Sequence, residues 1–151
     1  MAWPSDDQKK PWLVGLAHPY SDRDTIAKLW LSGQAGVATS SIAKRSWKLH
    51  RRPMHHIMDP RTLLPAESDC IQATVIGKEL VPAEVYAKCL LILGSREGPQ
   101  WLAQRRPDLA YLLLDKDGRQ YASANLTDYC HDVQMIERVA LTRSRKDGEH
   151  E

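Results

Sequence analysis

The sequence predicts an α+β fold in which antiparallel sheet hairpins pack against two or three helices. Short apolar runs rich in β-branched residues, such as Cys70–Ile76, alternate with turns, as is typical of strands. The segment from Pro82 to Gly94 has the terminal residues and the apolar content of a helix. Asp115-Lys116-Asp117-Gly118 is typical of a hairpin turn between two strands.

Length and composition favour one domain. A chain of 151 residues with 42% hydrophobic content is long enough for a sizeable core, and a net charge of +2 is too mild to indicate nucleic acid by itself. The three cysteines, an odd count without a CxxC pair, argue against a disulfide framework or structural zinc. Residues 1–11 form a polar lead-in without an apolar stretch, so we expect a cytoplasmic protein with no membrane partner.

The first elements are short. Trp12–Ala17 is most simply a buried strand, which a His-Pro pair ends. The next segment, Ile26–Leu31, leaves two interpretations open. Ser21 could cap a helix there, whereas a turn followed by Val37–Ser40 favours a hairpin. We favour strands.

Lys44–Arg52 is the most basic window of the chain and has one tryptophan within it. The simpler interpretation is a solvated hairpin, with Trp47 and Leu49 facing inward, the charges facing outward and a turn at Arg51–Pro53. The alternative is a surface for phosphate or single-stranded nucleic acid, because cations follow a phosphate backbone and rings stack on bases.

Two helices and a final hairpin are expected next. The helix that ends at Gly94 should bury a broad apolar face, and Ser95 can cap a second helix that runs to Arg106. The residues of the expected buried face are Val81, Val85, Cys89 and Ile92, with Leu90, Leu91 and Leu93 beside them. Leu109–Leu114 and Arg119–Ser123 are the strands on either side of the Asp-Lys-Asp-Gly turn.

The C-terminal residues change pattern. Tyr129, Val133, Ile136 and Ala140 fall at helical spacing, which predicts an amphipathic helix, and Ser144–Glu151 reads as a charged, disordered end. The chain is therefore divided into a lead-in (1–11), a main part (12–124) and an amphipathic helix with a charged tail (125–151).

The densest polar stretch is Met54–Pro65. His56 and Asp59 can exchange protons or bind a cation, and Arg61 can pair bidentately with phosphate or carboxylate oxygens. Pro60 keeps Asp59 out of helical geometry, so the carboxylate should turn outward in a loop at the end of a strand. The plain alternative is an ordinary surface turn that carries a few charges.

His-His-Ile-Met-Asp-Pro-Arg-Thr-x-x-Pro at 55–65 resembles the signature His-Ile-Ile-Asp-Pro-x-Thr-Gly-x-Pro of the FAD:protein FMN transferase (ApbE) family. Three flanking segments resemble that family in the same order, and the resemblance as a whole covers roughly residues 12 to 123. They are Gly36–Ser40, Ala73–Ile76 and Ala83–Gly94. The resemblance implies the C-terminal part of an ApbE-like flavin transferase domain.

The family transfers FMN from FAD to a threonine or serine of an acceptor flavoprotein, with Mg²⁺ as the metal. The resemblance therefore implies FAD as substrate and an acceptor flavoprotein as partner. By position it assigns His56 and Asp59 as catalytic residues and Glu84 as a metal ligand. The residues implied to contact FAD are Thr39, Ser40, His56 and Arg61, and hydroxyls such as those of residues 39 to 41 can donate to phosphate oxygens.

The chain departs from the family pattern where the metal would bind. The family helix carries an aspartate and, four residues later, a threonine, where this chain has Glu84 and Lys88. An ammonium cannot ligate Mg²⁺, so these two side chains should instead form an i,i+4 salt bridge worth roughly 0.3–0.5 kcal/mol. Leu63 replaces the signature glycine, and Ser41 stands where a glycine is usual.

The resemblance reaches only the C-terminal half of what the family normally needs. Three interpretations follow: a truncated member with reduced or no activity alone, a half-enzyme that needs a second chain to supply the missing half, or a fragment of a split gene. A rival from a different class is a non-catalytic basic module that uses Lys44–Arg52 to bind phosphate or nucleic acid, although nucleic acid is the less favoured partner.

Overall fold

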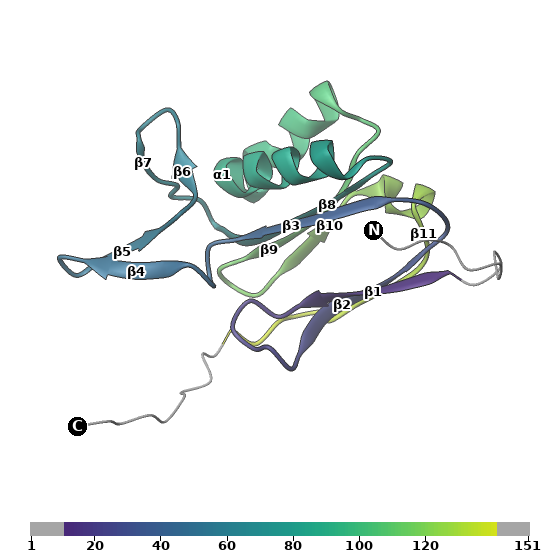
Figure 1. Ribbon diagram of the computed structural model, residues 1–151, viewed down its shortest axis with the longest axis horizontal. Helices are drawn as coiled ribbons and strands as arrows, with labels where there is room; N and C mark the ends of the chain where they lie inside the picture. Colours follow the sequence, from purple (N-terminus) through teal and green to yellow (C-terminus); the bar gives the residue numbers. More distant parts are fainter. Residues whose placement is uncertain (1–10, 142–151) are drawn as a thin grey trace.

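The computed structural model describes residues 11–141. The predicted lead-in up to residue 10 and the predicted charged end at Ser144–Glu151 lie outside this range. Three layers form the body (Figure 1): helix α1, a four-stranded sheet beneath it and a three-stranded sheet beneath that. The α+β class with antiparallel sheets is confirmed. No helix in residues 11–141 is long and apolar enough to cross a membrane.

One long helix, α1 (Leu80–Arg105), and a short 3-10 helix, η1 (Ala124–Asp128), accompany the strands. The strands are β1 (Trp12–Ala17), β2 (Thr25–Leu31), β3 (Gly36–Ser41), β4 (Ser46–Leu49), β5 (Arg52–His55), β6 (Met58–Asp59), β7 (Leu64–Pro65), β8 (Cys70–Gly77), β9 (Ala110–Asp115), β10 (Gln120–Ala122) and β11 (Cys130–Met135).

Strand β8 is the centre of the body. Every one of its residues is buried, because α1 covers one face of its sheet and the three-stranded sheet covers the other. Successive side chains of a strand point to opposite faces. Accordingly Val75 lies in the core beneath α1, while Ile76 lies in the core between the two sheets. The continuous β-branched run predicted this strand correctly.

The four-stranded sheet has the order β10-β9-β8-β3, and the three-stranded sheet has the order β1-β2-β11. The predicted strands at Ile26–Leu31 and Val37–Ser40 are both present, but they do not form a hairpin. β3 pairs with β8, so the chain crosses from one sheet to the other between β2 and β3. The predicted hairpin of β9 and β10 is confirmed, with Gly118 at a φ of 81° in its turn.

Helix α1 joins the two predicted helices, and its backbone leaves helical geometry at Gly94 (φ 80°, ψ −178°). There Asp69 accepts hydrogen bonds from the backbone N–H of Ser95 (2.8 Å) and from its hydroxyl. The carboxylate thus occupies the N-terminal end of the second helical segment, a position that favours negative charge. Two predicted helices become one interrupted helix.

The predicted buried face of this helix is found only in part. Leu90 and Leu91 are buried as expected, but Val81 and Val85 are exposed to 71% and 52%. The buried residues of α1 are Ala83, Ala87, Leu90, Leu91, Gly94, Gly98 and Leu102. Small alanines face the sheet because they let the helix approach it closely. In this first part of the helix the valines therefore lie outside, a choice that apolar spacing alone cannot settle.

Burial of β1 was also predicted wrongly. The strand is present with the expected bounds, but Trp12 and Leu13 are about half exposed, and Leu16 is the residue that reaches the core. β1 is an edge strand of the three-stranded sheet, and no described element covers the outer face of that sheet. A strand in a sheet that is covered on one face buries only the side chains that point to that face.

The predicted C-terminal helix is replaced by η1 and strand β11. Residues 130 to 135 pair antiparallel with β2, with Cys130 opposite Leu31 and Val133 opposite Leu29. An irregularity in register between Cys130 and Asp132 allows two apolar side chains three residues apart to face the same core. The spacing that resembled a helix therefore belongs to a bulged strand that satisfies the free edge of β2.

Candidate functional site

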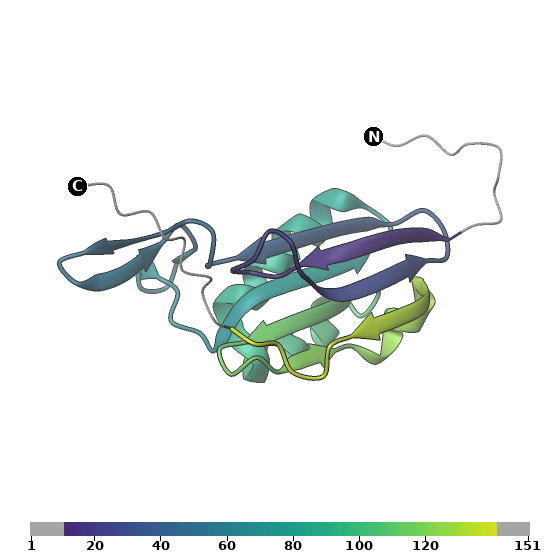
Figure 2. The same ribbon diagram turned by 90° about the horizontal axis from the view of Figure 1, so that it is seen from below.

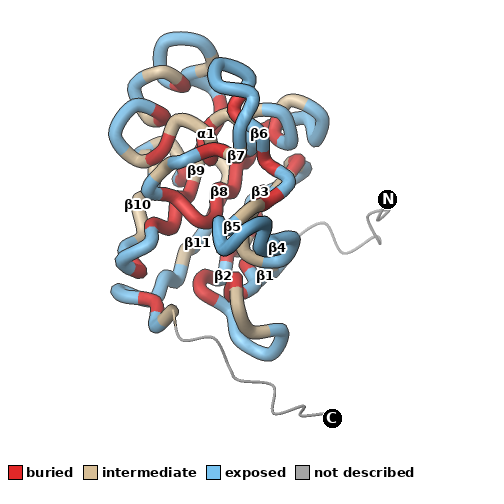
Figure 3. Tube along the Cα trace, turned by 90° about the vertical axis from the view of Figure 1, so that its left-hand side faces the viewer, coloured by how far each residue is buried: buried red, intermediate tan, exposed pale blue. Residues whose placement is uncertain are grey.

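The predicted functional stretch leaves the body after β3. Residues 44–55, called the arm here, contain β4 and β5 and extend away from the layers (Figures 1 and 2). Residues 56–65, called the signature loop, follow with β6 and β7 and lie beside α1. In Figure 3 most of the arm is coloured as exposed, in contrast to the buried β8.

All four residues of β4 are exposed, so the prediction that Trp47 and Leu49 face inward was wrong. The hairpin itself is confirmed, but its turn lies at His50 and Arg51, one or two residues before the predicted position. Nothing in the described part of the chain lies over the arm to give it an inner side.

Asp59 and Arg61 form the tightest polar group of the signature loop. The Asp59 side chain is only 10% exposed. It accepts hydrogen bonds from the Arg61 backbone N–H (2.9 Å), Nε (3.0 Å) and Nη2 (2.8 Å). The Arg61 guanidinium lowers the pKa of Asp59 by hydrogen bonding, and burial opposes this only in part. The two charges form an ion pair, so in this conformation the Asp59 carboxylate stabilises the loop.

A tight turn closes the loop behind this pair. The Leu63 backbone N–H donates to the Asp59 carbonyl (2.8 Å), and Leu63 has a φ of 58°. This left-handed conformation favours glycine, the residue of the family signature at this position. Leu63 keeps the glycine-like backbone, while its side chain is 78% exposed.

The two histidines have different environments. His55 is buried, and its Nε2 lies 3.0 Å from the carbonyl oxygen of Ala66, so it joins β5 to the chain after β7. His55 Nδ1 has no hydrogen-bond partner among the described residues. His56 is exposed, with Nδ1 3.4 Å from the carbonyl oxygen of Arg45. A carbonyl only accepts, so this contact places the proton on Nδ1 and leaves the Nε2 lone pair free.

His55 is a residue that the sequence reasoning did not single out. The alternation of β5 contained the signal, because Met54 and His55 must point to opposite sides of the strand. The sequence reasoning followed the signature motif to His56 and assigned His55 no role.

Thr39 and Ser40 are not brought together. They are neighbours in β3, so their side chains point to opposite faces of the sheet. The Thr39 hydroxyl forms a hydrogen bond with that of Thr74 (2.8 Å), and Ser40 is buried on the helix side opposite Ala73. The two hydroxyls therefore cannot both face one ligand in this arrangement.

Glu84 forms the predicted salt bridge. Lys88 Nζ lies 3.0 Å from Glu84 Oε1, and both side chains are about half exposed on α1. The described residues contain no group of three or more histidine, cysteine, aspartate or glutamate side chains that could hold a metal ion. The donors present therefore do not fit Mg²⁺ without additional ligands.

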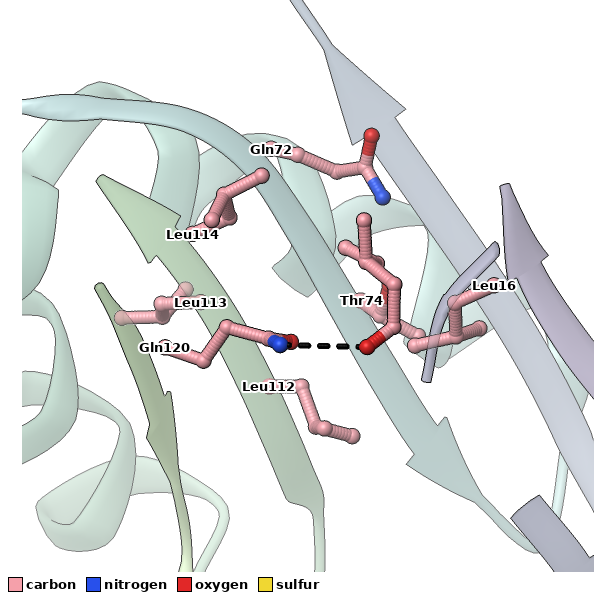
Figure 4. Close-up of a pocket in the computed structure, with 8 residues that line it drawn as sticks. Leu16, Gln72, Thr74, Leu112, Leu113, Leu114 and Gln120 are labelled. Atoms are coloured by element: carbon pink, nitrogen blue, oxygen red, sulfur yellow. Dashed lines mark hydrogen bonds between the residues drawn. The ribbon is translucent and has the colours of Figure 1, made fainter. Parts of the chain in front are cut away.

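Two hollows lie elsewhere in the structure. One, of about 640 Å³, opens at the surface and is lined by Arg119, Ile136, Glu137 and Arg138. The other is a small space between the two sheets, where Gln120 donates a hydrogen bond to the carbonyl of Ile26 (3.1 Å; Figure 4). Neither is lined by a predicted site residue, and the second is filled by side chains that tie the sheets together.

All three cysteines are unbonded thiols. Burial raises the pKa of the Cys70 thiol to about 12, helped by the nearby charge of Asp69. This thiol therefore stays protonated and unreactive near neutral pH.

The sequence matches a family model described as the ApbE family over residues 1–113. An FAD:protein FMN transferase of Klebsiella pneumoniae is 30% identical over 108 residues, which is 70% of this chain and 34% of that protein. The Escherichia coli K12 protein of the same name is 24% identical over 111 residues, 74% of this chain and 31% of its own length. The chain thus spans about a third of the length of the curated relatives it matches.

Solved structures show the same likeness. The ApbE protein of Thermotoga maritima superposes with a TM-score of 0.67 at 25% identity, covering 82% of this chain and 40% of that one. The flavin transferase ApbE of Vibrio cholerae gives a TM-score of 0.60 at 22% identity, covering 79% of this chain and 38% of the other.

Proposed function

Because this chain belongs to the ApbE family, we propose that it takes part in the transfer of FMN from FAD to a threonine or serine of an acceptor flavoprotein. The observation that carries the proposal is the signature loop. Arg61 holds the buried Asp59 carboxylate beside a turn in which Leu63 keeps the left-handed backbone of the family glycine. The backbone geometry of the signature turn is thus kept although its glycine is not.

In this proposal His56 is the base. Its Nδ1 points to the Arg45 carbonyl, which leaves Nε2 to take the proton of the acceptor hydroxyl. The hydroxyl oxygen forms a bond to the phosphorus on the FMN side of FAD. The phosphorus–oxygen bond of the pyrophosphate breaks, and AMP leaves with that electron pair. Asp59 and Arg61 hold the loop that presents His56, so they are positioning residues.

Mg²⁺, when bound, would neutralise negative charge on the phosphoryl oxygens. The described residues do not supply its site, because Lys88 forms an ion pair with Glu84 and no other acidic group among residues 11–141 joins them. We therefore infer that transfer requires further ligands, and with them much of the flavin pocket, from a second chain or segment. The chain alone should show little or no transfer.

The test is a flavin transfer assay with complementation. The purified chain is incubated with FAD, Mg²⁺ and an acceptor flavoprotein, with or without a fragment of a family relative that spans the part this chain does not cover. Covalent flavin is read as fluorescence on a denaturing gel. We expect a fluorescent acceptor band only when the fragment is present. The absence of a band under both conditions would overturn the proposal.

Matched histidine variants identify the base. His56→Ala should abolish the band, whereas His131→Ala, which changes an exposed histidine of β11, should leave it unchanged. Transfer that survives His56→Ala would exclude His56 as the base.

The altered metal positions can be tested by restoring the family pair. Glu84→Asp combined with Lys88→Thr removes the ammonium and returns two oxygen donors to one helical face. We expect Mg²⁺ to act at a lower concentration in the complemented assay with this variant. An unchanged Mg²⁺ dependence would mean that this helix contributes no metal ligand.

The exposed cations of the arm support a second candidate, a basic module that binds phosphate or nucleic acid without catalysis. A salt-sensitive shift of an oligonucleotide, without transfer of flavin in the complemented assay, would favour that candidate.

A further inference from the structure

The arm lies within a long stretch of the chain that has no acidic residue. From Thr25 to Met58 there is no aspartate or glutamate, while the basic residues are Lys28, Lys44, Arg45, Lys48, Arg51 and Arg52. Among the described residues, the basic side chains of the arm make one ion pair, between Lys44 and Asp22 at 3.3 Å, and both partners are exposed. The arm therefore presents a positive field that the rest of the chain leaves largely uncompensated.

One edge of the arm is an open strand edge. β4 pairs with β5 and with no other described strand. The turn at His50 and Arg51 has positive φ at both residues (47° and 67°), the geometry of a two-residue hairpin turn. Leu49 and Arg52 close this turn, so by the antiparallel alternation Trp47 also bonds inward, to Met54. Ser46 and Lys48 then point their N–H and C=O groups outward.

The two edges of the arm are not equivalent. Pro53, opposite Lys48, has no N–H, so the outer edge of β5 lacks a donor at that position. The outer edge of β4 keeps both donors and both acceptors. A further strand can therefore pair with β4 but has a broken ladder on β5.

The side chains of β4 differ between the two faces of the strand. Trp47 and Leu49 share one side of β4 and are exposed to 51% and 50%. The other side carries Ser46 and Lys48. An added strand would thus find apolar contacts on one face and a cation on the other, which suits a peptide that alternates apolar and acidic residues.

The start of β4 lies close to the proposed base, His56. Ser46 lies opposite His55 in the arm, and the carbonyl of Arg45 is the group that His56 Nδ1 contacts. A strand paired along β4 would run to Ser46. That residue directly follows Arg45, whose carbonyl His56 contacts.

We propose that the outer edge of β4 docks an extended acidic peptide as an additional strand. Docking is supported by the outer edge of β4, which no described strand pairs, and by the positive charge of the arm. The identification of the peptide as the segment of the acceptor flavoprotein that carries the modified hydroxyl rests on the proposed function. A peptide fits better than a nucleic acid, because outward N–H and C=O pairs recognise a peptide backbone and the arm offers a single aromatic ring for stacking.

Binding is measured without FAD or Mg²⁺, by fluorescence anisotropy, with a fluorescein-labelled peptide that repeats Asp-Val-Thr-Val. We expect it to bind with a salt-dependent affinity, and the peptide with lysine in place of aspartate to bind at least about tenfold more weakly. Equal binding of both peptides, or no binding of either, would overturn the proposal. Tighter binding of oligothymidylate than of the acidic peptide would also overturn it.

Two variants at one position separate the edge from the charge. Lys48→Thr removes the charge and keeps the outward N–H, so it should weaken binding by several-fold. Lys48→Pro removes both and should abolish binding. Lys28→Glu, at an exposed cation of β2 outside the arm, is the control and should bind within about twofold of the unchanged chain. If Lys48→Pro binds as well as Lys48→Thr, the strand-addition geometry is wrong.

A modified probe guards against an unfolded variant. The acidic peptide N-methylated at alternate residues cannot pair along one edge, and it should not bind the unchanged chain. Neither peptide-binding measurement involves flavin, so the two proposals can fail separately. Peptide binding without flavin transfer would contradict the proposed function alone. Flavin transfer without peptide binding would contradict only the docking of a peptide on β4.

Discussion

Two regions of this molecule are built in opposite ways. In the body, β8 is buried on both faces, and α1, β9 and the three-stranded sheet surround it. In the arm, all four residues of β4 are exposed, and a two-residue turn and the pairing with β5 hold the hairpin together. The body is stabilised by apolar burial, whereas an isolated two-stranded hairpin is marginal in water.

The candidate site residues of the signature loop, His56, Asp59 and Arg61, lie at the border of these regions. The signature loop is attached to the body by Ile57 and Ala66, which belong to the core beneath α1, and to the arm by His56. The comparison teaches that a change in the body should alter global stability. A change in the arm or the loop should alter local order and binding and leave global stability nearly constant.

The largest expected effect is a cavity in the body. Leu90→Ala empties a fully buried site between α1 and β8 and should lower the free energy of unfolding by about 3 kcal/mol. Leu49→Ala in the arm removes the same atoms from a half-exposed site and should change it by less than about 0.5 kcal/mol. Urea unfolding followed by tryptophan fluorescence measures both. Similar losses would remove the distinction between the two regions.

The second largest effect is expected at Gly36, where β3 and the start of α1 approach each other closely. A Cβ on Gly36 would lie 2.4 Å from the backbone nitrogen of Leu80, so Gly36→Ala must push α1 away from β3. We expect a loss of about 1–3 kcal/mol by urea unfolding. Gly33→Ala is the matched control, since a Cβ there meets nothing within 4 Å. A neutral Gly36→Ala would show that the start of α1 is free to shift.

A gain is expected in the signature loop. Leu63→Gly relieves a left-handed backbone that costs a leucine roughly 1–2 kcal/mol, and the extra freedom of glycine in the unfolded chain offsets part of this. The net stabilisation should be about 0.5 kcal/mol by urea unfolding. Leu64→Gly, in the neighbouring strand β7, should give no gain. A destabilising Leu63→Gly would mean that the exposed leucine side chain has a stabilising contact.

The smallest effect is the response of the loop to acid. The folded pKa of Asp59 lies below its unfolded value, because Arg61 hydrogen bonds favour the carboxylate. Its contribution to stability is therefore present above the unfolded pKa and is lost as the pH falls through the folded one, below about pH 4. NMR shifts of the Arg61 Nε–H should change in this range, while amides of β8 stay constant. Asp59→Asn should abolish the transition.

Much of the fold could be predicted from the sequence. The β-branched run of β8, the turn at Gly118 and the break at Gly94 each have a local cause, and each is found where it was expected. The salt bridge between Glu84 and Lys88 followed from i,i+4 spacing alone and is confirmed. Local chemistry of this kind depends on a few adjacent residues.

The errors concern which face is covered and by what. Val85 is as apolar as a core residue, but α1 uses its alanines to approach the sheet. Tyr129 and Val133 have helical spacing, but the unpaired edge of β2 makes a strand the better partner. Whether Trp47 faces a core depends on what lies over the arm, which no spacing within the arm reveals. The roles of His56, Asp59, Thr39, Ser40, Arg61 and Glu84 stay predictions for the experiments above.

The pairing of β11 with β2 has a consequence for biosynthesis. A ribosome releases β1 and β2 before β11, and residues 130 to 135 of β11 are the strand that pairs with the second edge of β2. Until those residues emerge, the nascent chain has an open strand edge with apolar residues such as Leu29 and Leu31 along it. Release of the C-terminal segment is thus the step that closes the lower sheet, and a ribosome stalled before it would display a chain suited to capture by a chaperone.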